Sequence, residues 1–288
     1  MARRKSLLVG LISSILSTVL LVAIVIGVLC AYVKIKYDVN IVDAVMQVKT
    51  LNEEYNPDEL FSNRFTEDDY SAAQLAVNGA VAGLISYSEQ EGYKLDTAIS
   101  GEFNGEINLT DKQSAALLNM ILKNQTETVG IQIAGETIEF ELVQIKFDNF
   151  NENKLDFNVV VKLDITKIKE NMSGFPLNYL SNFIPDNLYI SSTMELLVGD
   201  TPYEYSIESK SLTINNLNKE QTESLLSTLN LLMQFGEVET LNTTIGGAFV
   251  NALLGNSDVA GFAYSLKDIG ATDFNFSVNN EIITLNIF

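Results

Sequence analysis

The feature that most constrains this chain is an uncharged run of 27 residues, Leu7 to Val33, near its N-terminus. As an α-helix the run would be about 40 Å long, at about 1.5 Å per residue, and would cross a hydrocarbon core of about 30 Å. The apolar region of a cleaved signal peptide is shorter, and Leu29-Cys30-Ala31 is a poor cleavage site. We therefore predict an uncleaved transmembrane helix over residues 7–33. A removed signal peptide and a buried soluble helix are the alternatives.

The basic residues around this run predict its orientation. Arg3-Arg4-Lys5 and the amino terminus precede the run, and only Lys34 and Lys36 follow it closely. The excess of positive charge before the run favours a cytoplasmic N-terminus. We expect a single-pass protein of a bacterial plasma membrane, with residues 1–6 as its cytoplasmic tail and the remainder outside the cell.

The composition excludes several classes of function. Five of the 18 Lys and Arg lie in the first 36 residues, which contain no acid, so the remainder has 13 basic and 37 acidic side chains and a net charge of −24. Such a charge repels phosphate backbones, so nucleic acid is not expected as a partner. The chain has no histidine and one cysteine, Cys30. An intrachain disulfide, a Cys-based zinc site and a Ser-His-Asp triad are therefore excluded.

A stalk and linker are predicted over residues 34–65. Apolar residues keep a helical spacing from Ile41 to Leu51, and a polar stretch with Pro57 then ends this helix. A second helix is predicted over 66–87, where an N-cap threonine is followed three residues later by an acid. It opens an extracellular domain over residues 66–288.

From about residue 98 the apolar residues recur with the period of two that is typical of β-strands. In 155–165 (LDFNVVVKLDI) the odd-numbered residues predict a buried face, and the polar even-numbered ones, Asn158 among them, predict a face in water. Residues 137–147 show the same pattern with a phase slip after Leu142, which predicts a β-bulge. Further strands are predicted over 102–109, 187–198, 203–214, 273–280 and 281–288. The fold class is therefore α+β, with an antiparallel sheet into which the C-terminus is tied.

One short segment occurs twice. Residues 108–122 (NLTDKQSAALLNMIL) return in altered form at 216–230 (NLNKEQTESLLSTLN). In each copy a strand runs into an amphipathic helix, with Thr110 or Asn218 as the N-cap and a glutamine three residues later. The repeat is either a duplicated strand–helix unit or the product of caps and leucines that any such unit shares.

The order of the predicted elements resembles a known family. A basic flank, one transmembrane helix, a strand leading into an LTxxQ-type helix and two long strands precede an apolar, proline-punctuated segment, 175–190 (FPLNYLSNFIPDNLYI). Over residues 100–215 this order resembles membrane-anchored envelope proteins of Gram-positive bacteria with tubular lipid-binding (TULIP-like) domains. The resemblance implies a curved antiparallel sheet wrapped on amphipathic helices, with an apolar groove between them. This chain differs in an additional helix at 66–87, and in a helix at 237–254 with strands after it, which would cap or fill the groove.

The resemblance implies a lipid-binding groove whose walls come from the apolar faces. The floor of this groove would be formed by Phe157, Val159, Val161 and Leu163. Its lid would be formed by Leu117, Ile121, Leu225 and Leu229, and its lip by Phe175, Leu180 and Phe183. The alternative is that these side chains pack on one another as the core, because sheet and helix faces must bury something whether or not a ligand is present.

No motif in the sequence indicates catalysis or a cofactor. The acidic stretches 53–59 and 66–69 lack the alternating spacing of a calcium loop, and no pair of carboxylates is singled out for glycan hydrolysis. The glycine-bearing stretches lack the spacing of a phosphate-binding loop. We expect no enzyme activity, no metal and no cofactor.

The sequence therefore favours an anchored extracellular domain that binds lipid or another amphiphile in an apolar groove. Its partners would be the bilayer, through residues 7–33, and that amphiphile. The alternative is a non-enzymatic envelope scaffold or protein-interaction domain with a filled core and an envelope protein as its partner.

Overall fold

The computed structural model describes residues 31–32, 34–35, 41–61, 64–96, 105–124, 130–133, 136–151, 153–171, 184–199, 204–233, 238–254, 261–267, 270–272, 274–279 and 281–287. The chain divides into two compact units, Met1–Thr50 and Leu51–Phe288. In the first unit, helix α2 (Ile41–Leu51) extends to the unit boundary and confirms the helix expected there. Most of the predicted transmembrane segment lies outside the described residues. Within the described ranges, no helix combines the length and the apolar character that crossing a membrane requires.

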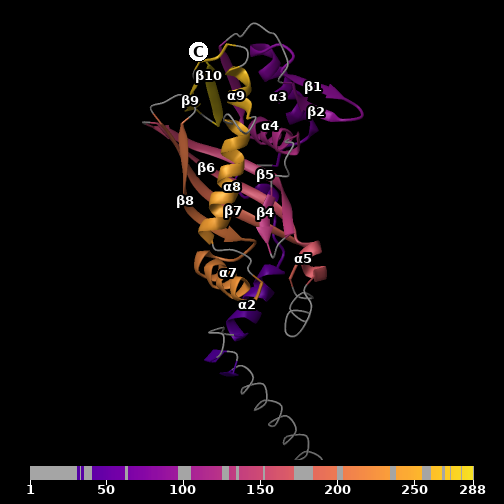
Figure 1. Cartoon of the computed structure of the whole chain (residues 1–288), viewed down its shortest axis with the longest axis vertical. Coiled ribbons are helices and arrows are strands. Elements are labelled where there is room, and N and C mark those ends of the chain that lie inside the picture. The colour runs from indigo at the N-terminus through magenta and orange to yellow at the C-terminus, as the bar shows by residue number, and fades with distance from the viewer. Residues whose placement is uncertain are drawn as a thin grey trace, which may run out of the picture. The chain divides into compact units, whose positions relative to one another are not determined.

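The second unit contains helices and three antiparallel sheets (Figure 1). A main sheet has the order β4-β5-β6-β7-β8, a small sheet has the order β3-β10-β9, and β1 and β2 form a hairpin. The strands are β1 (Ile85–Ser88), β2 (Gly92–Leu95), β3 (Glu106–Thr110), β4 (Gly130–Ile133), β5 (Glu136–Asn151), β6 (Lys154–Asp164), β7 (Asn187–Val198), β8 (Tyr205–Ile214), β9 (Phe274–Asn279) and β10 (Ile282–Ile287). The helical elements are η1 (Pro57–Glu59), α3 (Glu67–Ala80), α4 (Asp111–Asn124), α5 (Thr166–Asn171), α7 (Lys219–Met233), α8 (Val238–Leu253) and α9 (Phe262–Lys267). The α+β class is confirmed, but the strands form separate sheets where one had been expected.

The helix predicted over 66–87 is shorter than expected. Its N-terminus is correct, since Asp69 accepts a hydrogen bond from the backbone N–H of Thr66 over 2.7 Å. The helix ends at Ala80, and the chain turns through Gly83, whose φ of 81° is accessible to glycine without strain. The Asn78 side chain then bonds both the N–H and the C=O of Ile85, each over 2.8 Å, and so fixes the start of β1. The last part of the predicted helix is therefore a turn and a strand.

Both copies of the repeated segment form the predicted strand–helix unit. The Thr110 backbone N–H donates to Gln113 over 3.0 Å, and the Gln113 N–H donates back to the threonine hydroxyl over 3.3 Å. Asn218 and Gln221 make the same reciprocal pair over 3.0 and 2.9 Å. These capping boxes satisfy backbone donors that a helix start leaves free. α4 is buried along most of its length, and α7, among its described side chains at 219–227, buries Thr222, Leu225 and Leu226.

The long strands follow the predicted alternation, including the irregularity in β5. The register between β5 and β6 shifts between Leu142 and Gln144, where the sequence pattern slipped. The expectation that Asn158 lies in water is wrong. Its side chain is 8% exposed and bonds Asp148 over 2.5 Å and Thr193 over 2.8 Å. We call the face of the main sheet that carries Asn158 the outer face and the opposite one the inner face. On the outer face, side chains of β5, β6 and β7 bond one another, and Asn158 makes these bonds in place of bonds to water.

Part of the predicted linker lies against this outer face of the main sheet. The segment 51–65, which we call the strap, belongs to the second unit. Its contacts with the sheet are Tyr55 to Ser191 at 3.3 Å, the Phe61 N–H to Gln144 Oε1 at 3.1 Å, and Arg64 to Glu141 at 2.6 Å. Val143 and Val160, which lie on this face, are fully buried. Residues 51–61 and 64–65 therefore form part of the folded domain.

The capping boxes give a first testable prediction. Replacing Asn218 by Ala should lower the free energy of unfolding by about 1 kcal/mol, because the Gln221 backbone N–H loses its side-chain acceptor. Chemical denaturation measures this loss. Glu223→Ala, at an exposed site in the same helix, is the control and should change the stability by less than about 0.5 kcal/mol. Equal stability of the two variants would contradict the capping role.

Candidate functional site: the inner face of the main sheet

The predicted groove floor is a buried, apolar surface. Phe157, Val159, Val161 and Leu163 point to the same side of β6 and are 3% exposed or less. Neighbouring strands contribute Phe140, Leu142, Ile145, Leu188, Ile190, Met194, Leu196 and Leu212, all buried. The prediction of one continuous apolar face is confirmed.

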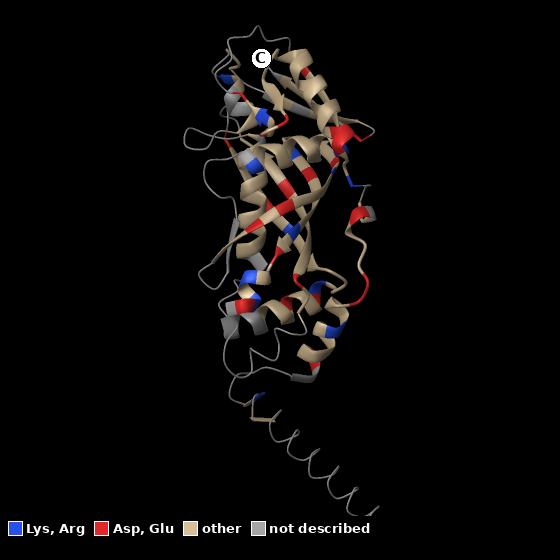
Figure 2. Cartoon of the chain, turned by 90° about the vertical axis from the view of Figure 1, so that its right-hand side faces the viewer, with Lys and Arg blue, Asp and Glu red and all other residues tan. Residues whose placement is uncertain are grey.

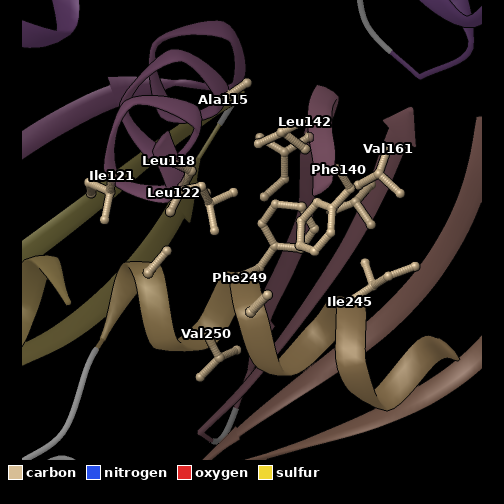
Figure 3. Close-up of a cluster of buried hydrophobic side chains, with 14 of the residues drawn as sticks. Ala115, Leu118, Ile121, Leu122, Phe140, Leu142, Val161, Ile245, Phe249 and Val250 are labelled. Carbon is tan, nitrogen blue, oxygen red and sulfur yellow. The ribbon is translucent and has the colours of Figure 1, made fainter. Parts of the chain in front are cut away.

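This face is occupied by helix α8 of the same chain. α8 contacts both edge strands of the sheet, β4 and β8, and therefore spans the inner face from edge to edge. The Phe249 ring lies 5.7 Å from the Phe140 ring and is 2% exposed. Figure 3 shows Phe249 and Ile245 extending from α8 toward strand residues, with Leu118 and Leu122 of α4 above them. Side chains of the chain itself thus lie where a bound acyl chain was predicted.

A buried polar cluster fixes α8 in this position. Asn242 of α8 is 2% exposed, and its Oδ1 accepts a hydrogen bond from the Ser192 hydroxyl over 2.7 Å. The Asn242 amide also donates to the Ser209 hydroxyl of β8. In the last turn of α8, Asn251 Oδ1 accepts a hydrogen bond from the Tyr205 hydroxyl over 3.1 Å. If α8 moved from the sheet to another apolar environment, Asn242 would lose both serine partners, and a buried carboxamide without hydrogen bonds is costly.

Gly246 permits the close approach of α8 to β7 and β8. A Cβ atom at this position would lie 2.9 Å from the Met194 sulfur and 3.0 Å from Ile207 Cγ2. The adjacent Gly247 has no atom within 4 Å of its Cβ position. The first glycine is therefore required by packing, whereas the second has room for a methyl group.

Two cavities between described side chains are small. One, between α8, α4 and the sheet, has a volume of about 10 Å³ and is lined by Leu118, Phe157 and Phe249 among others. Another has about 20 Å³ and lies between α4, α9 and the small sheet, where the Ser114 hydroxyl is buried without a hydrogen-bond partner. Ligand pockets are typically about 300 Å³ or larger, so each of these two holds at most a water molecule.

The predicted lid residues do not all face the floor. Leu117 lines the cavity beside the small sheet, so it points to the other side of α4. Ile121 faces the space above α8 (Figure 3), and Leu225 is buried on α7, which contacts β8. The Leu229 side chain and the predicted lip residues Phe175, Leu180 and Phe183 lie outside the described residues. The helix expected at 237–254, which would cap or fill the groove, is α8, and it covers the inner face of the main sheet.

The N-terminus of α4 carries a buried acid where it meets β5. Asp111 is 4% exposed, and its Oδ1 accepts a hydrogen bond from the Phe147 backbone N–H over 3.2 Å. The pKa of Asp111 is raised to about 6, mainly because the carboxyl group is buried. The hydrogen bond from Phe147 lowers the pKa, and the negative charge of Glu281 raises it further. Within the described part of the chain, no three acidic or cysteine side chains cluster as metal ligands would.

Comparison with known proteins gives little guidance. No protein-family model and no curated protein matches the sequence. Among solved structures, the chain is similar to that of a lipopolysaccharide binding protein with 9% sequence identity and a TM-score of 0.19. The match covers 63% of this chain and 40% of that chain. A likeness at this level carries no argument about function.

The two glycines of α8 provide a matched pair for mutation. Gly247→Ala should stabilise the protein by about 0.5–1 kcal/mol, because alanine costs less backbone entropy in a helix. Gly246→Ala should gain nothing or destabilise, because its methyl group meets Met194 and Ile207. Thermal and chemical unfolding measure both. An equal gain in the two variants would show that α8 does not pack closely on the sheet.

The raised pKa of Asp111 predicts that the difference in stability between the wild type and the Asp111→Asn variant depends on pH. The folded state holds the proton more tightly than the unfolded chain does, so this stabilising contribution is complete below about pH 4 and is lost as the pH rises through about 6. The variant cannot ionise and should be more stable than the wild type at pH 8, by up to about 3 kcal/mol. Loss of a favourable charge at the start of α4 offsets part of this gain. The difference should disappear near pH 4, and a constant difference between pH 4 and 8 would contradict the assignment.

Proposed function

We propose that this protein is a non-enzymatic, membrane-anchored scaffold of the bacterial envelope, in which the extracytoplasmic domain acts through its surface. The observation that carries the proposal is the position of α8, whose Phe249 and Ile245 fill the inner face of the main sheet. A domain with a filled core presents its surface, rather than its interior, to a partner.

The alternative is that an amphiphile binds in the same interior, as the resemblance to tubular lipid-binding proteins implies. Each methylene removed from water contributes about 0.8 kcal/mol, so an acyl chain of about twelve carbons would gain about 10 kcal/mol. It would first have to displace α8, exposing several large apolar side chains at about 1.5–3 kcal/mol each and breaking the Asn242 bonds. These terms are of similar size, so an amphiphile would compete with α8 and would not enter an empty groove.

Anchoring and orientation complete the proposal. Residues 7–33 would cross the plasma membrane once, with the N-terminus in the cytoplasm and the domain outside, as the charge bias favours. The acidic domain would be repelled by anionic headgroups and would stand away from the membrane surface.

Lipid analysis tests the filled core directly. The unit 51–288, gently purified, should carry no lipid in native mass spectrometry and should take up no fluorescent fatty acid in a saturable way. A Phe249→Ala variant, which opens space in the same place, is the matched comparison for the uptake assay. One lipid bound per wild-type domain would contradict the scaffold proposal and support amphiphile binding.

Crosslinking in cells tests the second half of the proposal. Photo-crosslinking residues at Leu75 and Tyr87, which are 75% and 56% exposed, should give covalent adducts with another envelope component. Protease added to intact cells should degrade the domain. An intact domain after this treatment would show that the orientation is reversed.

A further inference from the structure

The exposed face of the small sheet differs in chemistry from the rest of the molecule. β10 lies between β3 and β9, and the buried Ile107, Leu109, Ile283 and Leu285 turn one face of this sheet toward the core. The residues between them form the opposite face. From one end of the sheet to the other, these are Asn275, Asn286 and Glu106, then Ser277, Thr284 and Asn108, then Asn279, Ile282 and Thr110. We call this surface the amide face.

The amide face is almost free of charge, although the chain has a net charge of −19. Glu106 is the charged residue on it, and Ile282, 40% exposed, is the large apolar one. The outer face of the main sheet is quite different. It carries many acids (Figure 2), and there Lys210 bonds Asp156 over 2.6 Å and Glu195 over 2.8 Å. The small sheet thus exposes a nearly uncharged face, whereas the main sheet exposes a face with many charged side chains.

Hydrogen bonds within the amide face hold its side chains in place. The Thr284 hydroxyl donates to Asn108 Oδ1 over 2.6 Å, and the Asn108 amide donates to Glu106 over 2.8 Å. In the next strand pair the Asn286 amide donates to Asn275 Oδ1 over 3.0 Å. Each carboxamide has two N–H donors and an oxygen with two lone pairs, so the array has donors and acceptors beyond these bonds. An ordered array of this kind loses little side-chain entropy when it binds.

The chemistry of this array selects among classes of partner. A protein interface normally has a hydrophobic centre with aromatic or arginine anchors, and a membrane surface requires basic and large apolar side chains. The amide face has no aromatic, arginine or lysine side chain, and Ile282 is its one large apolar residue. Polyanions are repelled by the acidic chain around it. A neutral glycan fits, because its hydroxyl and acetamide groups both donate and accept hydrogen bonds, as carboxamides and hydroxyls do, and because it brings no charge.

We propose that the exposed face of β3, β10 and β9 is a binding site for a neutral glycan. Amide and hydroxyl side chains bond the sugar hydroxyls across the three strands, and Ile282 contacts an apolar sugar face at one end. This inference does not depend on the filled interior, and it supplies a partner class for the proposed scaffold.

The test uses the full chain in detergent. Binding is measured by calorimetry to chitohexaose, cellohexaose and maltohexaose, with heparin and polyphosphate as anionic probes and anionic phospholipid vesicles as a membrane probe. We expect saturable binding to at least one neutral hexasaccharide, with a dissociation constant between about 10 μM and 1 mM, and none to the anionic probes or the vesicles.

Variants assign the binding to the face. Thr284→Val keeps the shape of a β-branched residue and should weaken glycan binding at least fivefold, as should Asn286→Ala. Ser206→Ala, at an exposed position of β8, should change binding less than twofold. Circular dichroism confirms that each variant is folded. Binding to none of the three neutral hexasaccharides, binding to the anionic probes or vesicles alone, or glycan binding unchanged in both Thr284→Val and Asn286→Ala would overturn the proposal. Because none of these measurements involves fatty acid, a failure here is distinct from a failure of the filled-core proposal.

Discussion

Phe249 of α8 packs against Phe140 of β5 on the inner face of the main sheet, and the covering of this face is the constraint on which the domain depends. The sheet exposes a continuous apolar face, which must be covered for the fold to be stable in water. α8 covers it from β4 to β8, with Gly246 allowing close approach and Asn242 satisfied by two serines. α4 then packs against both α8 and the small sheet, so a single helix joins two hydrophobic layers.

The features that were predictable from the sequence are those whose cause is local. Gln113 and Gln221 lie three residues after their caps, and the alternation and bulge of β5 are properties of one strand. The hairpin of β1 and β2 was missed because its strands are too short to show a period, and the helix before it ends at a turn that requires Gly83. The separate small sheet and the strap were not predictable, nor was whether α8, the helix expected at 237–254, would cap the groove or fill it. They depend on contacts between segments far apart in the chain, such as Asn242 with Ser192.

The same limit applies to the candidate site. The sequence identified the buried apolar face of β6, because alternation shows which side chains share a face. It could not show what covers that face. An alternating apolar pattern is the same whether a ligand or a helix of the chain buries the face. The amide face illustrates the converse case. Its residues come from strands that are distant in sequence, and they form one surface only through the pairing of β10 with β3 and β9.

Native-state hydrogen exchange of the α8 amides tests the central claim most directly, because it measures the free energy needed to open the helix from the sheet. If α8 is part of the core, its slowest amides should exchange with the same opening free energy as those of β6, and added fatty acid should not change this value. Fast exchange of α8 beside a protected β6, or exchange accelerated by fatty acid, would show that the helix is a displaceable cover over a ligand groove.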